Sequence, residues 1–306
     1  MITNQRIVDN LKGIFPPVVT PFNRRGDVDE ERFRENLQKY AGIGLGGVVV
    51  AGSTGEALYL SEAERLRLVE IAREVVRPPE LLLVGTGLES TRETIRLSRE
   101  AIARGADALL VLPPHYYKSR MDSPTLLGHF RLLADSVKRP VILYSIPQFT
   151  GINMEAEVIA ELSGHPNIVG LKESSGQLAF VKTILRKVAR QRFRVLVGSV
   201  MILLDALRAG VAGAVLGQAC FAPELCVGVY EAFCNGRTKT ASELQQRLVP
   251  LAQKIALPFG VPGIKAALDL SGYHGGPPRS PLLALGPESR QAVAAALREA
   301  RAGLEL

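Results

Sequence analysis

Eight short apolar runs recur along this chain of 306 residues, and helical patterns separate several of them. Runs that are continuously apolar, without alternating polar residues, are typical of strands buried on both faces. The runs begin roughly 20 to 35 residues apart, which suits strand–helix–strand units. The predicted strands are residues 14–20, 46–52, 81–87, 107–114, 140–145, 167–172, 194–199 and 212–217. Eight strands, mostly alternating with helices, predict an α/β fold, a (β/α)₈ TIM barrel, and disfavour an open sheet.

Helix start signals support this interpretation. Ser61 and Glu64 have the spacing of a capping box before an amphipathic run, and Ser90 and Glu93 repeat that spacing. Gly105 follows the second of these runs, where glycine commonly ends a helix. Both segments are therefore predicted to be helices between strands.

The pattern changes in the last part of the chain. From about residue 223 onward the sequence has long helical patterns and no further clear strand. We therefore predict that residues 1–222 form the barrel, which carries the active site. Residues 223–306 are predicted to form a C-terminal helical extension packed on it.

Composition excludes several classes of protein. The net charge is +7, but the basic residues are spread along the chain. The densest basic segment, 186–194, lies around the end of a predicted helix, where positive charge is favourable without any ligand. Nucleic-acid binding is therefore disfavoured. No apolar run approaches the roughly 18 residues that span a membrane.

The N-terminus and the cysteines indicate the compartment. Residues 1–13 contain no apolar core of a secretory signal, and they are not typical of a transit peptide. The three cysteines form no CxxC pair, and an odd number argues against a disulfide framework. A reducing, cytoplasmic compartment is expected.

Two tempting ligand motifs fail. The sequence GIGLGG at 42–47 matches GxGxxG, but it precedes a strand where a dinucleotide-binding loop would follow one. The four histidines show no metal-ligand spacing. The sequence therefore gives no indication of a metal or nucleotide cofactor.

Reactive side chains gather at predicted strand ends, where a (β/α)₈ barrel carries its active site. Lys172 stands at the end of the sixth strand, where one more apolar residue would be expected. An amine in an apolar pocket loses its proton more easily and can attack a carbonyl carbon to form a Schiff base. The alternative is a lysine that reaches solvent or pairs with a carboxylate such as Glu56.

Three further strand-end groups have a catalytic and an ordinary interpretation. Tyr144, at the end of the fifth strand, could relay protons, or it could be a core aromatic residue with a satisfied hydroxyl. The turn GSTGE at 52–56 could hold a carboxylate on its N–H groups, or it could be a plain glycine turn. Tyr116 and Tyr117 follow the fourth strand and alone carry little signal.

Together these residues resemble the pyruvate-dependent class I aldolases of the dihydrodipicolinate synthase and N-acetylneuraminate lyase family. GGVVVAGSTGE at 46–56 is similar to the family's first signature. LYSIPQFTG at 143–151, followed by GLKESSG at 170–176, is similar to the second. The resemblance extends over essentially the whole chain.

The resemblance implies roles for individual residues. Lys172 would form the Schiff base with pyruvate, and Tyr144 would shuttle its protons. Ser53 and Thr54 would bind the pyruvate carboxylate, with Thr54 also in the proton relay. Tyr116, or Tyr117 as the alternative, would reach into the site of a neighbouring subunit.

The family also implies the wider setting of the reaction. No cofactor and no metal are needed, because the lysine is the electron sink. The partners are a small 2-oxo acid and an aldehyde, and the expected assembly is a homotetramer made of two dimers.

Other residues resemble one branch of the family. Phe149 stands where the synthase branch carries the arginine of its YNxPxRTG motif, which binds a substrate carboxylate. The YSIP segment and the C-terminal segment FGVPGIKAALDLSGYHGGPPRSPL look more like 4-hydroxy-2-oxoglutarate aldolases. Ser174 matches a serine proposed to contact substrate in that branch. Val215, in the last apolar run, completes the candidate substrate-binding residues.

The resulting hypothesis is a carbon–carbon lyase that cleaves 4-hydroxy-2-oxoglutarate to pyruvate and glyoxylate. Within the family, the alternative is dihydrodipicolinate synthase, which joins pyruvate to aspartate semialdehyde, or another 2-oxo acid aldolase. A non-catalytic barrel that binds a keto acid is the alternative of another class.

Overall fold

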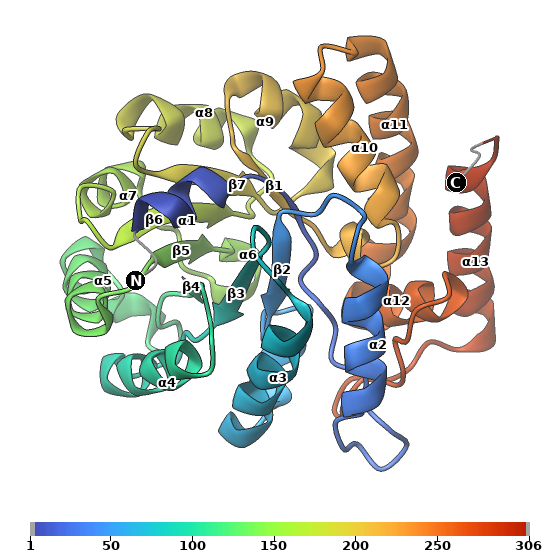
Figure 1. Cartoon of the computed structure of the whole chain (residues 1–306), viewed down its shortest axis with the longest axis horizontal. Coiled ribbons are helices and arrows are strands. Elements are labelled where there is room, and N and C mark those ends of the chain that lie inside the picture. The colour runs from blue at the N-terminus through green and yellow to red at the C-terminus, as the bar shows by residue number, and fades with distance from the viewer. Residues whose placement is uncertain (1–3, 304–306) are drawn as a thin grey trace.

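The computed structural model describes residues 4–303, and its centre is one sheet of eight parallel strands (Figure 1). The strands are β1 (Gly13–Phe15), β2 (Gly47–Val50), β3 (Leu81–Gly85), β4 (Ala108–Val111), β5 (Val141–Ser145), β6 (Ile168–Glu173), β7 (Arg194–Val197) and β8 (Gly213–Val215). Each of the eight predicted strands is confirmed, and nearly all their residues are buried, as non-alternating apolar runs require.

The sheet curls into a nearly closed barrel. Along the sheet the strand order is β1-β8-β7-β6-β5-β4-β3-β2, so β1 and β2 are its two ends. Backbone hydrogen bonds join these ends: Val49 N–H donates to Pro16 O at 3.0 Å, and Val18 N–H donates to Val49 O at 2.9 Å. The first strand is shorter than the predicted 14–20, because Pro16 and Pro17 have no N–H to donate to a ladder.

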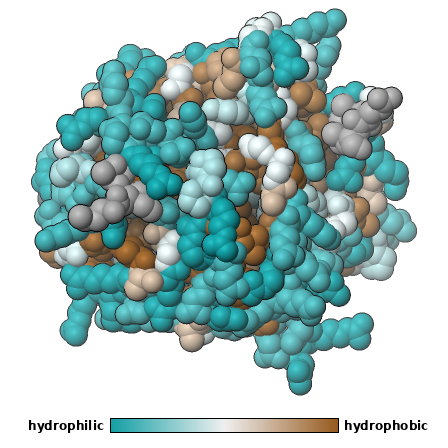
Figure 2. Space-filling view, in the orientation of Figure 1, coloured by the Kyte–Doolittle hydropathy of each residue, from teal (hydrophilic) through white to brown (hydrophobic). Residues whose placement is uncertain are grey.

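Helices surround the outside of the barrel in Figure 1. They are α1 (Asn4–Asn10), α2 (Glu30–Tyr40), α3 (Glu62–Val75), α4 (Thr91–Ala103), α5 (Ser123–Val137), α6 (Pro147–Thr150), α7 (Ala156–Leu162), α8 (Leu178–Lys187), α9 (Leu203–Ala209), α10 (Pro223–Cys234), α11 (Thr238–Leu251), α12 (Leu257–Leu270) and α13 (Pro287–Arg301). The same face, drawn space-filling in Figure 2, is mainly hydrophilic, with hydrophobic side chains visible in the hollows. No helix among residues 4–303 is long and apolar enough to cross a membrane.

Both predicted helix starts are confirmed, but only one of the two capping boxes is complete. Ser61 caps α3 in a complete capping box with Glu64. Ser90 caps α4 by accepting a hydrogen bond from Glu93 N–H, but the reciprocal bond is missing, since the Glu93 carboxylate binds Arg96 instead. Gly105 follows α4 with φ of +101°, in the left-handed region, as a helix-ending glycine should.

Two layers of apolar side chains fill the fold. A large cluster lies between the strands and the surrounding helices. A smaller cluster fills the barrel interior, and α1 contributes Ile7 and Val8 to it, followed by Leu11. Because α1 supplies side chains to this interior cluster and contacts β6, it covers one end of the barrel.

The C-terminal part of the chain is helical, as predicted. Helices α11 and α13 pack on each other, and a π-helical turn (Ala252–Ala256) joins α11 to α12. Helix α10 contacts both β1 and α9, so it covers the barrel wall. The boundary between residues 222 and 223 stays a prediction.

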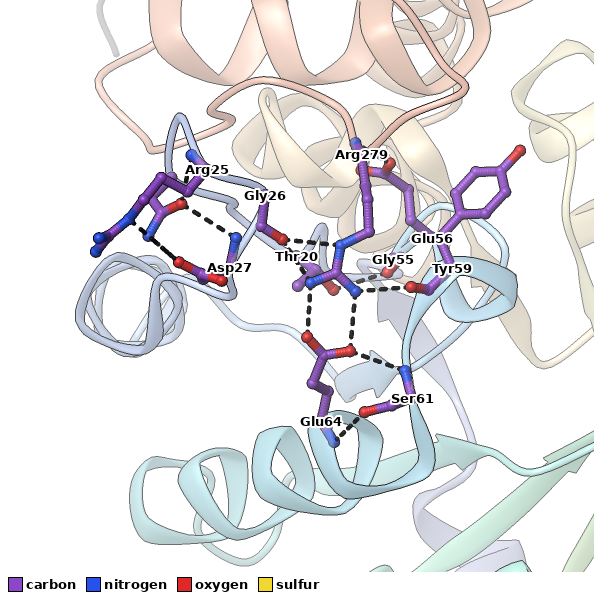
Figure 3. Close-up of polar contacts among 11 residues, drawn as sticks. Thr20, Arg25, Gly26, Asp27, Gly55, Glu56, Tyr59, Ser61, Glu64 and Arg279 are labelled. Carbon is purple, nitrogen blue, oxygen red and sulfur yellow. Dashed lines mark hydrogen bonds and ion pairs between the residues drawn. The ribbon is translucent and has the colours of Figure 1, made fainter.

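A network around Arg279 ties the segment after α12 to the segment after β2 (Figure 3). The Arg279 guanidinium donates two hydrogen bonds to the Glu64 carboxylate, at 2.6 and 2.8 Å, and others to Gly26 O and Tyr59 O. The hydrogen bonds from Arg279, followed by those from Ser61, lower the pKa of Glu64 to about 2. The Glu64 carboxylate also accepts a hydrogen bond from Ser61 N–H in the capping box. Glu64 therefore joins the segment after α12 and the segment after β2 to helix α3.

A fully buried ion pair lies beside this network. Lys265 of α12 places Nζ 2.5 Å from Glu56 Oε1, and both side chains are 1% exposed. The other Glu56 oxygen accepts the Arg279 backbone N–H at 2.9 Å. Lys265 also donates to Pro277 O and lies 4.4 Å from the centre of the Phe22 ring. Burial lowers the pKa of Lys265, and the charge of Glu56 opposes that shift.

We predict that Lys265→Met destabilises the protein by about 3–5 kcal/mol, because it leaves the Glu56 carboxylate buried without its cation. The double variant Glu56→Gln/Lys265→Met removes both charges and should recover most of this loss. Urea unfolding monitored by circular dichroism measures both. Equal midpoints for the wild type and Lys265→Met would contradict the prediction.

Candidate active site

A cavity of about 270 Å³ opens at the carboxyl ends of the strands. Six of the seven predicted site residues line it: Ser53, Thr54, Tyr144, Lys172, Ser174 and Val215. Lys172 is the only charged side chain among the described residues of this lining. The barrel therefore brings the predicted groups together around one amine in otherwise neutral surroundings.

A β-bulge turns Lys172 toward the barrel interior. The pairing of β5 with β6 shifts by one residue between Val141 and Ile142. Ile168 and Leu171 of β6 both pack in the outer apolar layer, although a regular strand would place residues three apart on opposite faces. One extra residue in β6, the bulge, allows both of these side chains to point to the same face of the sheet. Lys172 then faces inward, together with Tyr144 of the neighbouring strand.

Lys172 and Tyr144 are direct neighbours. They pair across β5 and β6, both are buried, and Lys172 Nζ lies 4.0 Å from the centre of the Tyr144 ring. The Tyr144 hydroxyl lies 3.4 Å from Ser53 Oγ. Glu56 pairs with Lys265, so the alternative in which Glu56 neutralises Lys172 is wrong. The Lys172 amine therefore faces an aromatic ring and a chain of hydroxyl groups.

The turn after β2 is held in an unusual conformation. Ala51 and Glu56, on either side of it, have φ of 53° and 56°, in the left-handed region that non-glycine residues rarely adopt. Thr20 Oγ1 donates to Gly55 O at 2.7 Å, which anchors the turn to the segment after β1 (Figure 3). Strain of this kind persists only where surrounding contacts hold it.

The backbone of this turn has unused donors. Within residues 4–303, neither Ser53 N–H nor Thr54 N–H donates a backbone hydrogen bond. Both residues line the cavity and also carry hydroxyl groups. Successive free N–H groups beside hydroxyls are suited to bind a carboxylate.

Ser174 presents a second polar group. Its side chain is buried and lines the cavity, and its hydroxyl has no hydrogen-bond partner among the described residues. Gln148 Nε2 donates to Ser174 O at 2.7 Å and fixes the backbone there. A Cβ atom at Gly198 would lie 1.9 Å from Ser174 Oγ, so the glycine leaves the room that this hydroxyl needs.

The residue after the lysine has a different environment. Glu173 is fully buried, and Leu171, two positions before it, packs in the outer layer. Burial raises the pKa of Glu173, while the hydrogen bonds from Ser175 oppose the shift. Glu173 does not line the cavity, so its carboxyl group is not a candidate acid or base there.

A second cavity of about 460 Å³, mostly apolar, adjoins the first. The two share several lining residues, namely Ser53, Tyr144, Ile146, Phe149, Gly260 and Val261. Phe149 of α6 is 70% exposed at this junction, so an apolar ring stands where the resemblance suggested an arginine in other members. Ser145 lies on the outer face of β5 and does not line the first cavity, which contains Lys172 and is called the catalytic cavity below.

The seventh predicted site residue lies elsewhere. Tyr116 and Tyr117 are 76% and 70% exposed, and their rings meet edge to face with centroids 5.1 Å apart. Neither lines the catalytic cavity of its own chain. Their role at a neighbouring subunit's site stays a prediction.

Sequence reasoning missed part of the lining. Gly198, Ser199 and Gln218 follow β7 and β8, where the strand-end rule could have indicated them. Gly260 and Val261 come from α12, and no local sequence signal places that helix against the strand ends. Among residues 4–303, no group of three or more His, Cys, Asp or Glu side chains could hold a metal ion.

Comparisons with known proteins agree with this architecture. The sequence profile of the Dihydrodipicolinate synthetase family matches residues 10–300. This chain belongs to that family. It is accordingly an enzyme, of the lyase and synthase kind that the family comprises.

Two similar curated proteins have different names. A 4-hydroxy-tetrahydrodipicolinate synthase from Methanothrix thermoacetophila is 37% identical over 279 residues, covering 91% of this chain and 93% of its own. A probable mitochondrial 4-hydroxy-2-oxoglutarate aldolase from Emericella nidulans is 37% identical over 295 residues, covering 95% and 94%. Equal identity to both leaves the substrate to be argued from the site.

Solved structures share the fold. YagE, a prophage protein of the family from E. coli K12 solved in complex with pyruvate, has a TM-score of 0.89 and 29% identity, covering 95% of this chain and 98% of its own. A protein described as a putative dihydrodipicolinate synthase from Thermus thermophilus has a TM-score of 0.83 and 36% identity, covering 94% and 98%. The likeness therefore extends over the barrel and the C-terminal helices together.

We predict that Gly198→Ala displaces Ser174, because the new methyl group overlaps the serine hydroxyl. The kcat/KM of the lyase or synthase reaction that this enzyme catalyses should fall at least tenfold. The matched control is Gly128→Ala on α5, where a Cβ meets nothing within 4 Å. Steady-state kinetics, with melting temperature as the check on folding, measure the effect. Unchanged kcat/KM in Gly198→Ala would show that the Ser174 hydroxyl does not need this space.

Proposed function

We propose that the chain is a Schiff-base-forming aldolase that makes or breaks a carbon–carbon bond between pyruvate and an aldehyde. The observation that carries the proposal is the buried Lys172 amine beside Tyr144, at the end of β6, in a cavity whose described lining has no other charged side chain. An amine in such surroundings is a nucleophile toward ketones. The pyruvate bound to the family member YagE supports the choice of 2-oxo acid.

The proposed reaction begins with addition of Lys172 Nζ to the substrate ketone. The carbinolamine that forms then loses water to give an iminium. In cleavage, the breaking bond joins the carbon beside the iminium to the carbon that bears the hydroxyl group. This hydroxyl loses its proton, and its carbon and oxygen become the carbonyl group of the aldehyde. The electron pair of the broken bond moves into the iminium and gives an enamine. Protonation and hydrolysis release pyruvate and regenerate the amine.

The neighbouring groups have roles in this sequence. Ser53 and Thr54, with their free N–H groups, bind the carboxylate next to the ketone. The Tyr144 hydroxyl, 3.4 Å from Ser53 Oγ, exchanges protons with the carbinolamine oxygen and the aldehyde oxygen. Thr54 belongs to the same relay. Val215 closes the apolar side of the pocket.

For the substrate we propose 4-hydroxy-2-oxoglutarate, cleaved to pyruvate and glyoxylate. Phe149 lacks the cation that the synthase branch offers to the carboxylate of aspartate semialdehyde, and one relative of 37% identity has that aldolase name. The second carboxylate of 4-hydroxy-2-oxoglutarate would have to be bound by neutral groups. The second candidate is condensation of pyruvate with aspartate semialdehyde, because relatives of equal identity are named for a synthase. We further propose a cytoplasmic homotetramer in which Tyr116, exposed on the single chain, enters a neighbouring site.

Borohydride trapping should find a stable pyruvate adduct on Lys172, because reduction of the iminium fixes pyruvate to the amine that formed it. Lys172→Ala should give no adduct, and Lys182→Ala is the matched control. Mass spectrometry of peptides locates the modification. An adduct on another lysine, or none on the wild type, would refute the proposed mechanism.

The substrate proposal predicts that kcat/KM for cleavage of 4-hydroxy-2-oxoglutarate exceeds kcat/KM for condensation of pyruvate with aspartate semialdehyde. Loss of a charge-assisted contact at position 149 disfavours the semialdehyde by roughly 10- to 100-fold. Both rates can be measured on the same preparation with coupled assays. A faster semialdehyde reaction would favour the second candidate and leave the Lys172 chemistry intact.

A further inference from the structure

Gln218 is a buried polar residue of the catalytic cavity to which no role has yet been assigned. It belongs to a short 3₁₀ turn, Gly217–Cys220, directly after β8. The residue is buried, with 5% of its surface exposed, and it lines the cavity. Among residues 4–303, no hydrogen bond joins its side-chain amide to another group, although its backbone O accepts two. An amide on the wall of a cavity that has no protein partner is available to a ligand.

Gln218 shares the cavity with Ser174, whose buried hydroxyl has no partner among the described residues. Ser174 directly follows β6. Ser199, which follows β7 between them in the strand order, lines it as well. Three successive strand ends therefore supply neutral polar side chains. The carboxylate-binding turn after β2 is a separate part of the lining.

Charge decides what these groups can receive. Lys172 is the only charged side chain in the described lining of this cavity, and in the proposed reaction its nitrogen is consumed by the ketone. A second substrate carboxylate would therefore meet no cation there. Several neutral donors can hold a carboxylate in the same way as a cation does, by hydrogen bonding to its charged form. An amide N–H₂ and serine hydroxyls are such donors.

We propose that the Gln218 amide, with the Ser174 hydroxyl, binds the carboxylate at the end of the substrate remote from the ketone, and so determines specificity for 2-oxo diacids. This inference rests on the proposed aldolase function and adds the site of the second carboxylate. Pyruvate alone has no such group. Gln218 should therefore affect cleavage of the diacid and leave formation of the pyruvate adduct unchanged.

The decisive variant is Gln218→Glu, which keeps the shape of the side chain and replaces donors with a negative charge. Its kcat/KM for 4-hydroxy-2-oxoglutarate should fall about 100-fold or more, mainly through KM, because like charges would face each other. The loss should grow with pH as the introduced carboxyl ionises. Gln218→Met, which removes the donors without adding charge, should lose roughly tenfold. The extent of borohydride-trapped pyruvate adduct on Lys172 should stay at the wild-type level in Gln218→Met, which adds no carboxylate to the cavity that holds the amine.

The matched control is Gln246→Glu on the exposed face of α11, which makes the same change in net charge away from the cavity. It should match the wild type in both assays. If Gln218→Glu folds poorly, Gln218→Met supplies the same comparison of the two assays.

Three results would overturn the inference. Cleavage by Gln218→Glu within about threefold of the wild type would show that this side chain does not face the second carboxylate. In Gln218→Met, equal losses of cleavage and of pyruvate adduct would mean that Gln218 only supports the shape of the site. A wild-type protein that forms no adduct on Lys172 would refute the proposed function itself, and this inference with it.

Discussion

The buried pair of Glu56 and Lys265 is the contact on which the geometry of the site depends. Glu56 ends the turn that presents Ser53 and Thr54, and Lys265 belongs to α12, which supplies Gly260 and Val261 to the cavity wall. A buried charge is tolerated only when it is paired, so neither side chain can leave the other without a large cost. The pair therefore fixes the C-terminal helices against the carboxyl ends of the strands, where the cavity lies.

The second constraint is the placement of a lone amine in neutral surroundings. Arg279 and Glu64 form a charged network close by, but neither lines the catalytic cavity. Inside it, Lys172 meets the ring of Tyr144 and several hydroxyl groups. Neutral hydrogen-bonding groups can exchange protons with an amine without forming a fixed ion pair, which would hold the amine in its unreactive charged form. The network stabilises the scaffold, and the described lining of the cavity places no carboxylate beside the Lys172 amine.

Local patterns in the sequence were enough to predict the eight strands, because each strand contains a continuous apolar run, even where a charged residue stands at one end, as in β6 and β7. They were also enough to place Lys172 and Tyr144 at strand ends. Three features could not be predicted in this way. The bulge in β6 depends on register with β5, and the pair of Glu56 with Lys265 joins residues distant in the chain. Gln218 has no pattern around it and becomes a candidate only when its burial and missing partner are known.

The residues of the cavity fall into two groups, those for the chemistry common to the family and those for the choice of substrate. In the proposed reaction, the ketone end of the substrate binds at Lys172, Tyr144 and the turn after β2, which sequence motifs reveal. The rest of the lining, where the aldehyde end would lie, comes from the segments after β6, β7 and β8 and from Phe149 at the junction of two cavities. A change from a charged to a neutral side chain at this end is expected to change which substrate is bound without altering the amine or its proposed proton relay. Substrate choice can therefore change within one barrel while the bond-breaking chemistry stays the same.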